Sequence, residues 1–326
     1  MERIVVAGAG SIGCFVGGLL AAVGHDVVLL GRARVLDEIR AQGLGLSDFG
    51  GLDLSVDVDQ LELSEDPTCL KDATLVLLTV KTGATSSMAS EIAAHAPADV
   101  TVVSLQNGRE AIEALRAGLP GRDVRAGMVP FNVVPVGLGR YHRATSGDIV
   151  IEAGPGDLAQ LLNVAHLAVT ESDWIEAIQW GKLLINLNNA VNAVSGLPLQ
   201  AQLLDRAWRR LMADQMAEGL AVLKAAGIPE QSTAPVPSRL IPFILRLPTP
   251  LFRRVAARMI AIDAEARTSM AYDLAAGRQT EIDALQGTIV ALGQAHGVPT
   301  PICAHVAALI AQAKPGVGLS PDDLRP

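Results

Sequence analysis

Three polar side chains lie at helical spacing in an otherwise apolar stretch of the second half of the chain. Lys182, Asn186 and Asn189 fall at positions i, i+4 and i+7, so an α-helix places them on one face. An ammonium group can protonate an oxygen that gains negative charge, and carboxamides can orient the carbonyl that carries it. The stripe therefore predicts a proton donor with orienting amides for a carbonyl substrate.

A glycine-rich turn follows the first apolar run of the chain. Residues 3–7 read Arg-Ile-Val-Val-Ala, and a Gly-x-Gly-x-x-Gly sequence then leads into an apolar helical pattern. In this strand, turn and helix pattern the glycines permit the tight turn, the approach of a pyrophosphate and close helix packing. Free N–H groups at the helix start bind phosphates. We predict a dinucleotide-binding turn made of Gly8, Ala9, Gly10, Ser11, Ile12 and Gly13.

The end of the second expected strand distinguishes the two nicotinamide cofactors. NAD-dependent enzymes usually carry Asp or Glu there to accept a hydrogen bond from the ribose 2′-hydroxyl, whereas this chain has Gly31 and Arg32. The guanidinium of Arg32, helped by Arg34, can form charge-assisted bonds with a 2′-phosphate. The sequence therefore predicts NADPH/NADP as the cofactor.

The elements that must position these residues change in character along the chain. Through about residue 170, short runs rich in Val, Ile and Leu alternate with helical patterns, as in buried parallel strands of an α/β sheet. We expect strands at 4–7, 27–30, 75–80, 100–105 and 124–129, with helices at 11–23, 34–42, 86–95 and 109–117. Alternating apolar residues at 44–63 predict an antiparallel excursion. This half is expected to be a Rossmann-type doubly wound parallel sheet.

The second half is predominantly helical in pattern. Long helices are expected at 176–194, 200–226, 264–276 and 279–295. Six prolines between Pro229 and Pro250 predict a surface excursion with one short helix. We therefore expect an NADP-binding Rossmann domain at 1–171 and an all-helical substrate-binding and catalytic domain at 172–326.

Composition excludes several classes of protein. A net charge of −8, with scattered arginines, gives no basic surface for nucleic acid. The apolar stretch at 14–23 is too short to span a membrane, and three dispersed cysteines favour neither a disulfide framework nor a metal site. We expect a cytoplasmic protein that acts on a small molecule without a metal. The long amphipathic pattern at 200–226 is also compatible with a homodimer.

Taken together, the motifs resemble those of the ketopantoate reductase (2-dehydropantoate 2-reductase) family over nearly the whole chain. They are the glycine turn, Arg32, Val80-Lys81-Thr82, Gln106-Asn107-Gly108, Lys182-x-x-x-Asn186, and Ser269-Met270 followed by Thr280-Glu281-Ile282-Asp283. The resemblance implies NADPH-dependent reduction of 2-dehydropantoate (ketopantoate) to (R)-pantoate, in pantothenate and coenzyme A biosynthesis.

The resemblance also implies roles for individual residues. Lys182 corresponds to the general acid that protonates the ketone oxygen, and the carboxylate of Glu281 is expected near both cofactor and substrate as a second catalytic group. Lys81 and Asn107 are expected to bind the cofactor, since each also follows a predicted strand, where open α/β sheets bind ligands. The expected substrate-binding residues are Asn107, Lys182, Asn186, Asn189 and Ser269.

One position departs from the family pattern. The family commonly has a second asparagine eight residues after the lysine, where this chain has Ala190. Asn189 lies within roughly 20° of Lys182 around a helix of 3.6 residues per turn and could face the same substrate. A paralogous NADPH-dependent reductase of a different 2-oxo acid, or an opine-type dehydrogenase, is therefore an alternative. A non-catalytic NADPH-sensing protein is a further one, although such a protein would not need Lys182, Asn186 and Glu281.

Overall fold

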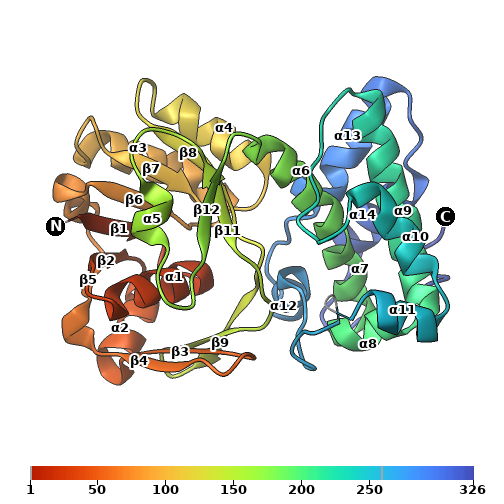
Figure 1. Cartoon of the computed structure of the whole chain (residues 1–326), viewed down its shortest axis with the longest axis horizontal. Coiled ribbons are helices and arrows are strands. Elements are labelled where there is room, and N and C mark those ends of the chain that lie inside the picture. Colours follow the sequence, from red (N-terminus) through yellow and green to blue (C-terminus); the bar gives the residue numbers. More distant parts are fainter. Residues whose placement is uncertain (1, 258–259) are drawn as a thin grey trace. The chain divides into compact units, whose positions relative to one another are not determined.

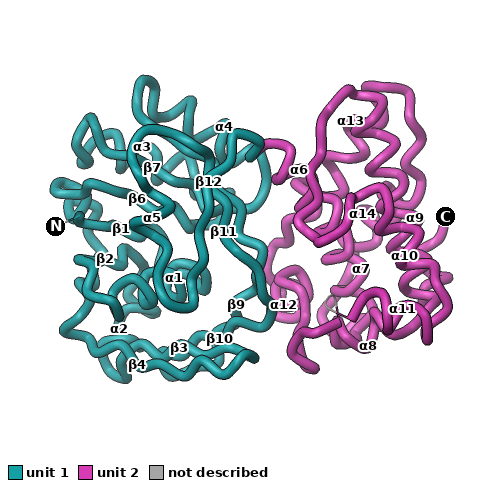
Figure 2. Tube along the Cα trace, in the orientation of Figure 1, with its two compact units in different colours: residues 1–175 teal, residues 176–326 magenta. Residues whose placement is uncertain are grey.

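The computed structural model describes residues 2–257 and 260–326. The chain folds into two compact units, residues 1–175 and 176–326, which are distinguished by colour in Figure 2. Each unit has its own apolar core. The first is built on β-sheets and the second on helices, so the expected α/β fold followed by a helical half is confirmed.

An eight-stranded sheet forms the centre of the first unit, in the order β12-β11-β8-β7-β6-β1-β2-β5. All neighbouring strands are parallel except β8 and β11. Because the chain passes from β1 outward to β2 and β5 and then returns to β6, the winding direction reverses beside β1, where such sheets bind ligands. The strands are β1 Arg3–Ala7, β2 Asp26–Leu30, β5 Glu62–Ser64, β6 Leu75–Leu78, β7 Thr101–Ser104, β8 Val124–Met128, β11 Ile149–Glu152 and β12 Val169–Ser172.

Helix α1 (Ser11–Ala22) lies between this sheet and a smaller one (Figure 1). A Cβ on Gly17 would come within 2.7 Å of Leu29 on β2, and a Cβ on Gly18 within 2.7 Å of Leu44 on β3. These two glycines therefore let the helix approach both sheets closely. The smaller sheet has the order β4-β3-β10-β9, with β3 Leu44–Asp48, β4 Asp53–Val56, β9 Val133–Gly137 and β10 Arg140–Arg143.

The antiparallel excursion expected at 44–63 is present as β3 and β4. Its partner β10, which pairs parallel to β3, comes from a distant part of the sequence and was not predicted. The remaining helices of the unit are α2 Ala33–Gln42, α3 Thr85–His95, α4 Arg109–Gly118 and α5 Leu158–Leu162, and 3-10 turns lie at Val58–Gln60, Pro67–Asp72 and Thr82–Ala84.

The second unit consists of helices around a core that includes Trp180, Trp208 and Phe252. Arg209 is fully buried there, and its guanidinium donates to the carbonyls of Leu203, Leu204, Leu245 and Leu247. The helices are α6 Ile175–Asn186, α7 Asn188–Ser195, α8 Leu199–Leu204, α9 Arg206–Ala225, α10 Ile241–Arg246, α11 Thr249–Val255, α12 Ser269–Ala275, α13 Thr288–His296 and α14 Pro301–Gln312, with a 3-10 turn at Ser238–Leu240 and a π-helix at Asp283–Gly287.

Several helix predictions in this unit were wrong in extent. The pattern at 200–226 is divided at Asp205, whose carboxylate accepts from the Ala207 N–H at 2.7 Å and starts α9. The stretch at 229–250 contains α10 and the start of α11 rather than one helix. Pro242 and Pro250 lie in the first turns of these helices, where a missing N–H is tolerated. Helix α14 was not predicted.

Three further findings concern membrane-spanning helices, cysteines and metal-binding groups. No helix among the described residues is both long and apolar enough to cross a membrane. Cys14, Cys69 and Cys303 are free thiols. In residues 2–257 and 260–326, no group of three or more His, Cys, Asp or Glu side chains could hold a metal ion.

Candidate active site

The glycine turn joins β1 to α1 at the carboxyl end of the main sheet. Gly8 has φ of +124°, and a Cβ there would lie 2.6 Å from the backbone nitrogen of Val80, just after β6. The N–H groups of Gly8 and Ala9 donate to the carbonyl of Leu30 at 2.9 and 3.0 Å. The turn is therefore bonded to the end of β2 and packed on the end of β6, and only glycine fits at residue 8.

Gly13 and Gly10 have different surroundings. A Cβ on Gly13 would lie 2.2 Å from the Gly8 carbonyl oxygen, whereas nothing lies within 4 Å of a Cβ on Gly10. The Cys14 N–H makes the first bond back into the turn, to Gly10 at 2.8 Å. The preceding N–H groups, from Ser11 to Gly13, lie at the positive end of the helix. This open, donor-rich backbone fits a dinucleotide pyrophosphate.

Thr79 supports the turn and was not singled out from the sequence. Its hydroxyl donates to the Gly8 carbonyl at 2.7 Å, and its N–H donates to the Ala7 carbonyl at 2.9 Å. In the sequence it fell inside the strand expected at 75–80, and only the structure, where β6 ends at Leu78, places its hydroxyl just beyond the strand. Thr79 thereby holds Gly8 against the neighbouring strand.

Arg32 lies next to this turn. It is the N-cap residue of α2 and its side chain is exposed. A Cβ on the preceding Gly31 would lie 2.4 Å from the Cβ of Ala9, so the two segments are in close contact. Within the described ranges the Arg32 guanidinium makes no hydrogen bond or ion pair. Its donors are available to an anionic group bound beside the turn.

Lys81 and Asn107 follow the neighbouring strands β6 and β7, and both are exposed. The hydroxyl of Thr82 donates to the Asn107 carbonyl at 3.4 Å, which links the two turns. Gly108 has φ of +84° and starts α4. The two predicted residues therefore lie on adjacent turns at the same edge of the sheet as the glycine turn.

The buried amide of Gln106 joins these two turns. Its Nε2 donates to the Val80 carbonyl and to the Thr85 hydroxyl oxygen, both at 2.8 Å. Its Oε1 accepts from the Ser104 hydroxyl at 3.0 Å. The sequence placed Gln106 in a motif without a role. The structure shows that both ends of its amide are bonded and that it connects the ends of β6 and β7.

In the second unit, Lys182 lies on α6 and is partly buried. Burial lowers the pKa of its ammonium group from the ordinary 10.5 to about 8, because poorly hydrated surroundings disfavour the charged form. A lysine with such a pKa can exchange a proton near neutral pH. Asn186, one helical turn further on, is buried.

A loop packs on α6 beside Lys182. The Gln231 N–H donates to the Ala177 carbonyl at 2.8 Å, and a Cβ on Gly181 would lie 1.9 Å from the Gln231 carbonyl oxygen. Glycine at residue 181 is therefore required for this contact. The loop was predicted only as a proline-rich excursion, and Gly181 was the one signal that something approaches the helix there.

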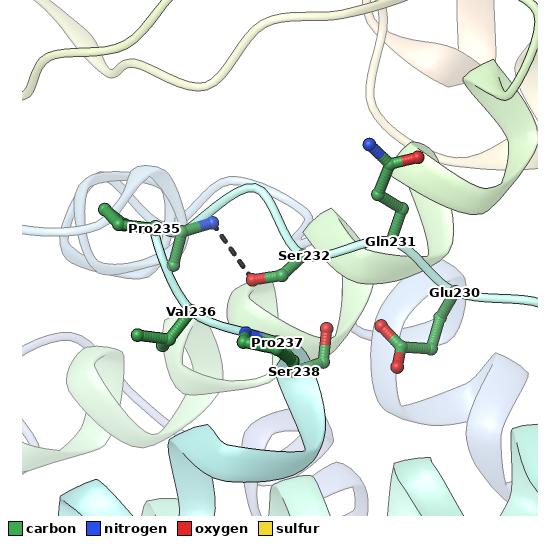
Figure 3. A pocket seen from close by; sticks show the side chains of 8 residues that line it. Glu230, Gln231, Ser232, Pro235, Val236, Pro237 and Ser238 are labelled. Atoms are coloured by element: carbon green, nitrogen blue, oxygen red, sulfur yellow. Dashed lines mark hydrogen bonds between the residues drawn. The ribbon is translucent and has the colours of Figure 1, made fainter.

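The same loop lines an open pocket of about 330 Å³ (Figure 3). Figure 3 shows the Glu230 carboxylate and the Ser238 hydroxyl turned toward each other and the Gln231 side chain turned away. Glu230 Oε2 and Ser238 Oγ are buried without a hydrogen-bond partner among the described residues. The pocket is lined by Glu230, Gln231, Ser232, Ala234, Pro235, Val236, Pro237 and Ser238.

The helix expected at 176–194 is present over nearly that whole range, as α6 and α7, but it is interrupted at one residue. Leu187 separates α6 from α7, although its φ of −54° and ψ of −28° are helical. Lys182 and Asn186 lie on α6, whereas Asn189 lies on α7. The angle between Lys182 and Asn189 expected for one unbroken helix therefore does not follow from periodicity alone, because Leu187 interrupts the helix between them.

Two further predicted residues, Asn189 and Ser269, lie on α7 and at the start of α12. Asn189 is partly buried, and its carbonyl accepts from the Thr268 hydroxyl at 3.1 Å. The Thr268 N–H donates to Asn192 Oδ1 at 3.0 Å. Thr268 is the N-cap residue of α12, so these bonds hold the exposed Ser269, the first residue of α12, next to α7.

Two positions singled out in the sequence remain, Ala190, where the family commonly has asparagine, and the predicted catalytic residue Glu281. Ala190 is 0% exposed and belongs to the core of the second unit. Glu281 is partly buried and lies two residues before the π-helix Asp283–Gly287. The structure thus groups the glycine turn with Arg32, Lys81 and Asn107 in one unit and the remaining predicted residues in the other, where all but Glu281 lie on helices.

A doubly wound sheet with a glycine turn beside its central strand, and a helical unit with a low-pKa lysine among amides, define an NAD(P)-dependent oxidoreductase. The sequence profile of the ketopantoate reductase PanE/ApbA family matches residues 4–156, and the profile of that family's C-terminal domain matches residues 174–314. The chain therefore belongs to the ketopantoate reductase family, and the resemblance seen in the sequence is confirmed.

Individual relatives agree with this family. A crystal structure of a PanE/ApbA family ketopantoate reductase from Ralstonia eutropha JMP134 is 31% identical, with a TM-score of 0.79, covering 95% of this chain and 98% of that one. A 2-dehydropantoate 2-reductase of Halobacterium salinarum is 26% identical, covering 96% of this chain and 99% of that protein. D-mandelate dehydrogenase with NADH and anilino(oxo)acetate shares the fold, with a TM-score of 0.77 at 22% identity, covering 95% of this chain and 98% of that one.

Proposed function

We propose that this chain reduces a small 2-oxo acid with NADPH, and that the substrate is 2-dehydropantoate, which becomes (R)-pantoate in pantothenate and coenzyme A biosynthesis. The observation that carries the proposal is Lys182, a partly buried lysine with a pKa of about 8 on a helix that also carries Asn186. Membership of the ketopantoate reductase family supports the reaction class.

We assign cofactor binding to the first domain. The N–H groups from Ser11 to Gly13 would hold the pyrophosphate, and Arg32 would bind the 2′-phosphate of the ribose. Lys81 and Asn107, on the adjacent turns, would hold the nicotinamide half. When bound, the reduced cofactor supplies a hydride to the carbonyl carbon of the substrate.

We assign proton transfer and substrate orientation to the second domain. Lys182 Nζ would donate a proton to the ketone oxygen as that oxygen gains charge, so the carbonyl becomes a hydroxyl. The amides of Asn186 and Asn189 and the hydroxyl of Ser269 would orient the 2-oxo acid. The carboxylate of Glu281 would accept a hydrogen bond from a hydroxyl of either ligand.

The reaction can be tested by following the loss of NADPH absorbance with 2-dehydropantoate and a panel of other 2-oxo acids. We expect turnover with 2-dehydropantoate to have the highest kcat/KM of the panel. Turnover of another 2-oxo acid with no activity toward 2-dehydropantoate would refute the substrate. No turnover of any ketone would refute the reductase and favour an NADPH-binding sensor.

A reductase of a different 2-oxo acid is the second candidate. The observation that favours it is Ala190, which is fully buried and offers no amide where the family commonly has one. D-mandelate dehydrogenase shows that this fold accommodates other substrates, although its likeness to this chain extends to the fold alone. The same panel of substrates distinguishes the two candidates.

A further inference from the structure

Two buried glutamines converge on the joint between α6 and α7. Gln286 Nε2 donates to the Leu187 carbonyl at 2.8 Å, and Gln215 Nε2 donates to the same oxygen at 3.3 Å. Gln286 is 0% exposed and Gln215 1% exposed. One side chain comes from the π-helix and the other from α9, so three distant segments meet at this carbonyl.

The orientation of both amides follows from their shared partner. A carbonyl oxygen only accepts hydrogen bonds, so each glutamine must present its nitrogen to Leu187. Gln215 Oε1 and Gln286 Oε1 are then buried without a hydrogen-bond partner among the residues the structure describes. Unpartnered buried oxygens are unfavourable, so the pair is poorly explained as polar groups placed only to stabilise the core.

The joint lies between the residues that the proposed function requires. Lys182 and Asn186 precede Leu187 on α6, and Asn189 follows it on α7. Gln286 belongs to the π-helix that begins two residues after Glu281. Single-turn π-helices occur frequently at functional sites, because they change the direction in which the adjoining residues point.

We propose that Gln286 and Gln215 are positioning residues, which hold the Leu187 joint and so set the orientation of the Lys182 helix relative to Asn189 and to the segment of Glu281. Neither glutamine touches the reacting atoms. The inference rests on the proposed function, because it assigns these two residues to the same site.

The test uses Gln286→Met and Gln215→Met in the full-length protein. Methionine is of similar length, and it removes both the donor and the unpartnered oxygen. We expect either change to lower kcat about tenfold, as expected for a small displacement of a catalytic group, while the Kd for NADPH stays within about twofold. Wild-type kcat in both variants would overturn the proposal.

A second readout does not depend on turnover. The chain has five lysines, Lys71, Lys81, Lys182, Lys224 and Lys314, so the Lys182 signal in a 13C-lysine-labelled sample can be assigned by its loss in Lys182→Arg. We expect the pKa of Lys182 measured by NMR to rise toward the ordinary lysine value in Gln286→Met, because a looser joint admits water. An unchanged pKa in both glutamine variants would overturn the proposal even if the wild-type protein reduces no ketone.

Ile310→Val on α14 is the matched control, since it weakens the same core away from the joint. At a comparable decrease in Tm, we expect this variant to keep the wild-type kcat and the wild-type pKa of Lys182. Equal losses in Ile310→Val would show that general loosening explains the effect, which would refute a positioning role. The wild-type protein could reduce no ketone while the pKa of Lys182 still shifts in the glutamine variants. That result would support the positioning role of Gln286 and Gln215 and refute the proposed reaction.

Discussion

The two units hold their proposed site residues by different means. In the first unit, Gln106 joins the turns after β6 and β7, and both ends of its amide are bonded. In the second, Gln215 and Gln286 both donate to Leu187, and their oxygens have no partner among the described residues. Parallel strands already bring their carboxyl ends together, so the fully hydrogen-bonded amide of Gln106 is enough to connect the turns after β6 and β7. Two helices have no such constraint, and long-range contacts must hold their joint.

Lys182→Ala gives the largest expected effect and separates proton transfer from cofactor binding. Loss of a positioned general acid should lower kcat by about 10² to 10⁴-fold. The Kd for NADPH, measured by fluorescence titration, should stay within about twofold, because Lys182 belongs to the second unit. Lys224→Ala on α9 is the control and should behave as wild type. Retention of full turnover in Lys182→Ala would remove this residue as the acid.

Arg32→Ala tests the first unit and should have the opposite pattern of effects, with weaker NADPH binding and little change in kcat. The Kd for NADPH should rise about ten- to a hundredfold, which corresponds to the loss of one or more charge-assisted hydrogen bonds. The Kd for NADH and kcat at saturating cofactor should change little. Arg34→Ala should have a smaller effect on NADPH. Equal wild-type affinity for NADPH and NADH would contradict the assigned cofactor preference.

The pH profile of kcat measures the environment of Lys182. A proton donor must be protonated, so kcat should be high below the folded-state pKa of about 8 and fall as the pH rises through it. Between pH 7 and pH 9 we expect roughly a tenfold decrease. In Lys182→Arg this basic limb should disappear along with most of the activity. A wild-type limb near the ordinary lysine pKa would show that burial does not act on the group.

Gln106→Met gives the smallest expected effect on function and contrasts the two kinds of amide. The change leaves the Val80 carbonyl and the Thr85 and Ser104 hydroxyls without a partner, so it should lower the free energy of unfolding by about 1 to 3 kcal/mol. We expect a severalfold weaker affinity for NADPH and an unchanged pKa of Lys182. The exposed Gln42→Met is the control. We expect Gln286→Met to lower the free energy of unfolding by less than Gln106→Met does, because the Gln286 oxygen has no partner to lose among the described residues. A larger decrease for Gln286→Met would contradict this contrast between the two amides.

Strands and helices were predicted correctly from the sequence where a local apolar pattern coincides with the alternation of strand and helix in a parallel sheet. The strands β1, β2, β6, β7 and β8 and the helices α1 to α4 lie close to their expected positions, whereas β5, β11 and β12 of the same sheet were not predicted. Short apolar runs separated by helical patterns define such units, and glycines at a turn mark where backbones approach closely. Strand β10 could not be predicted, because its pairing with β3 depends on a contact between segments far apart in the chain.

The sequence by itself determined that a glycine turn, Arg32, Lys81 and Asn107 follow strands of one parallel sheet, because strand order and direction place those ends together. It also showed that Lys182 and Asn186 share a helix face. Only the tertiary structure decided that this helix ends at Asn186, that Ala190 is buried and that Leu187 accepts from two distant glutamines. Helical periodicity describes a single helix, whereas the joint between two helices is set by the side chains that pack against it.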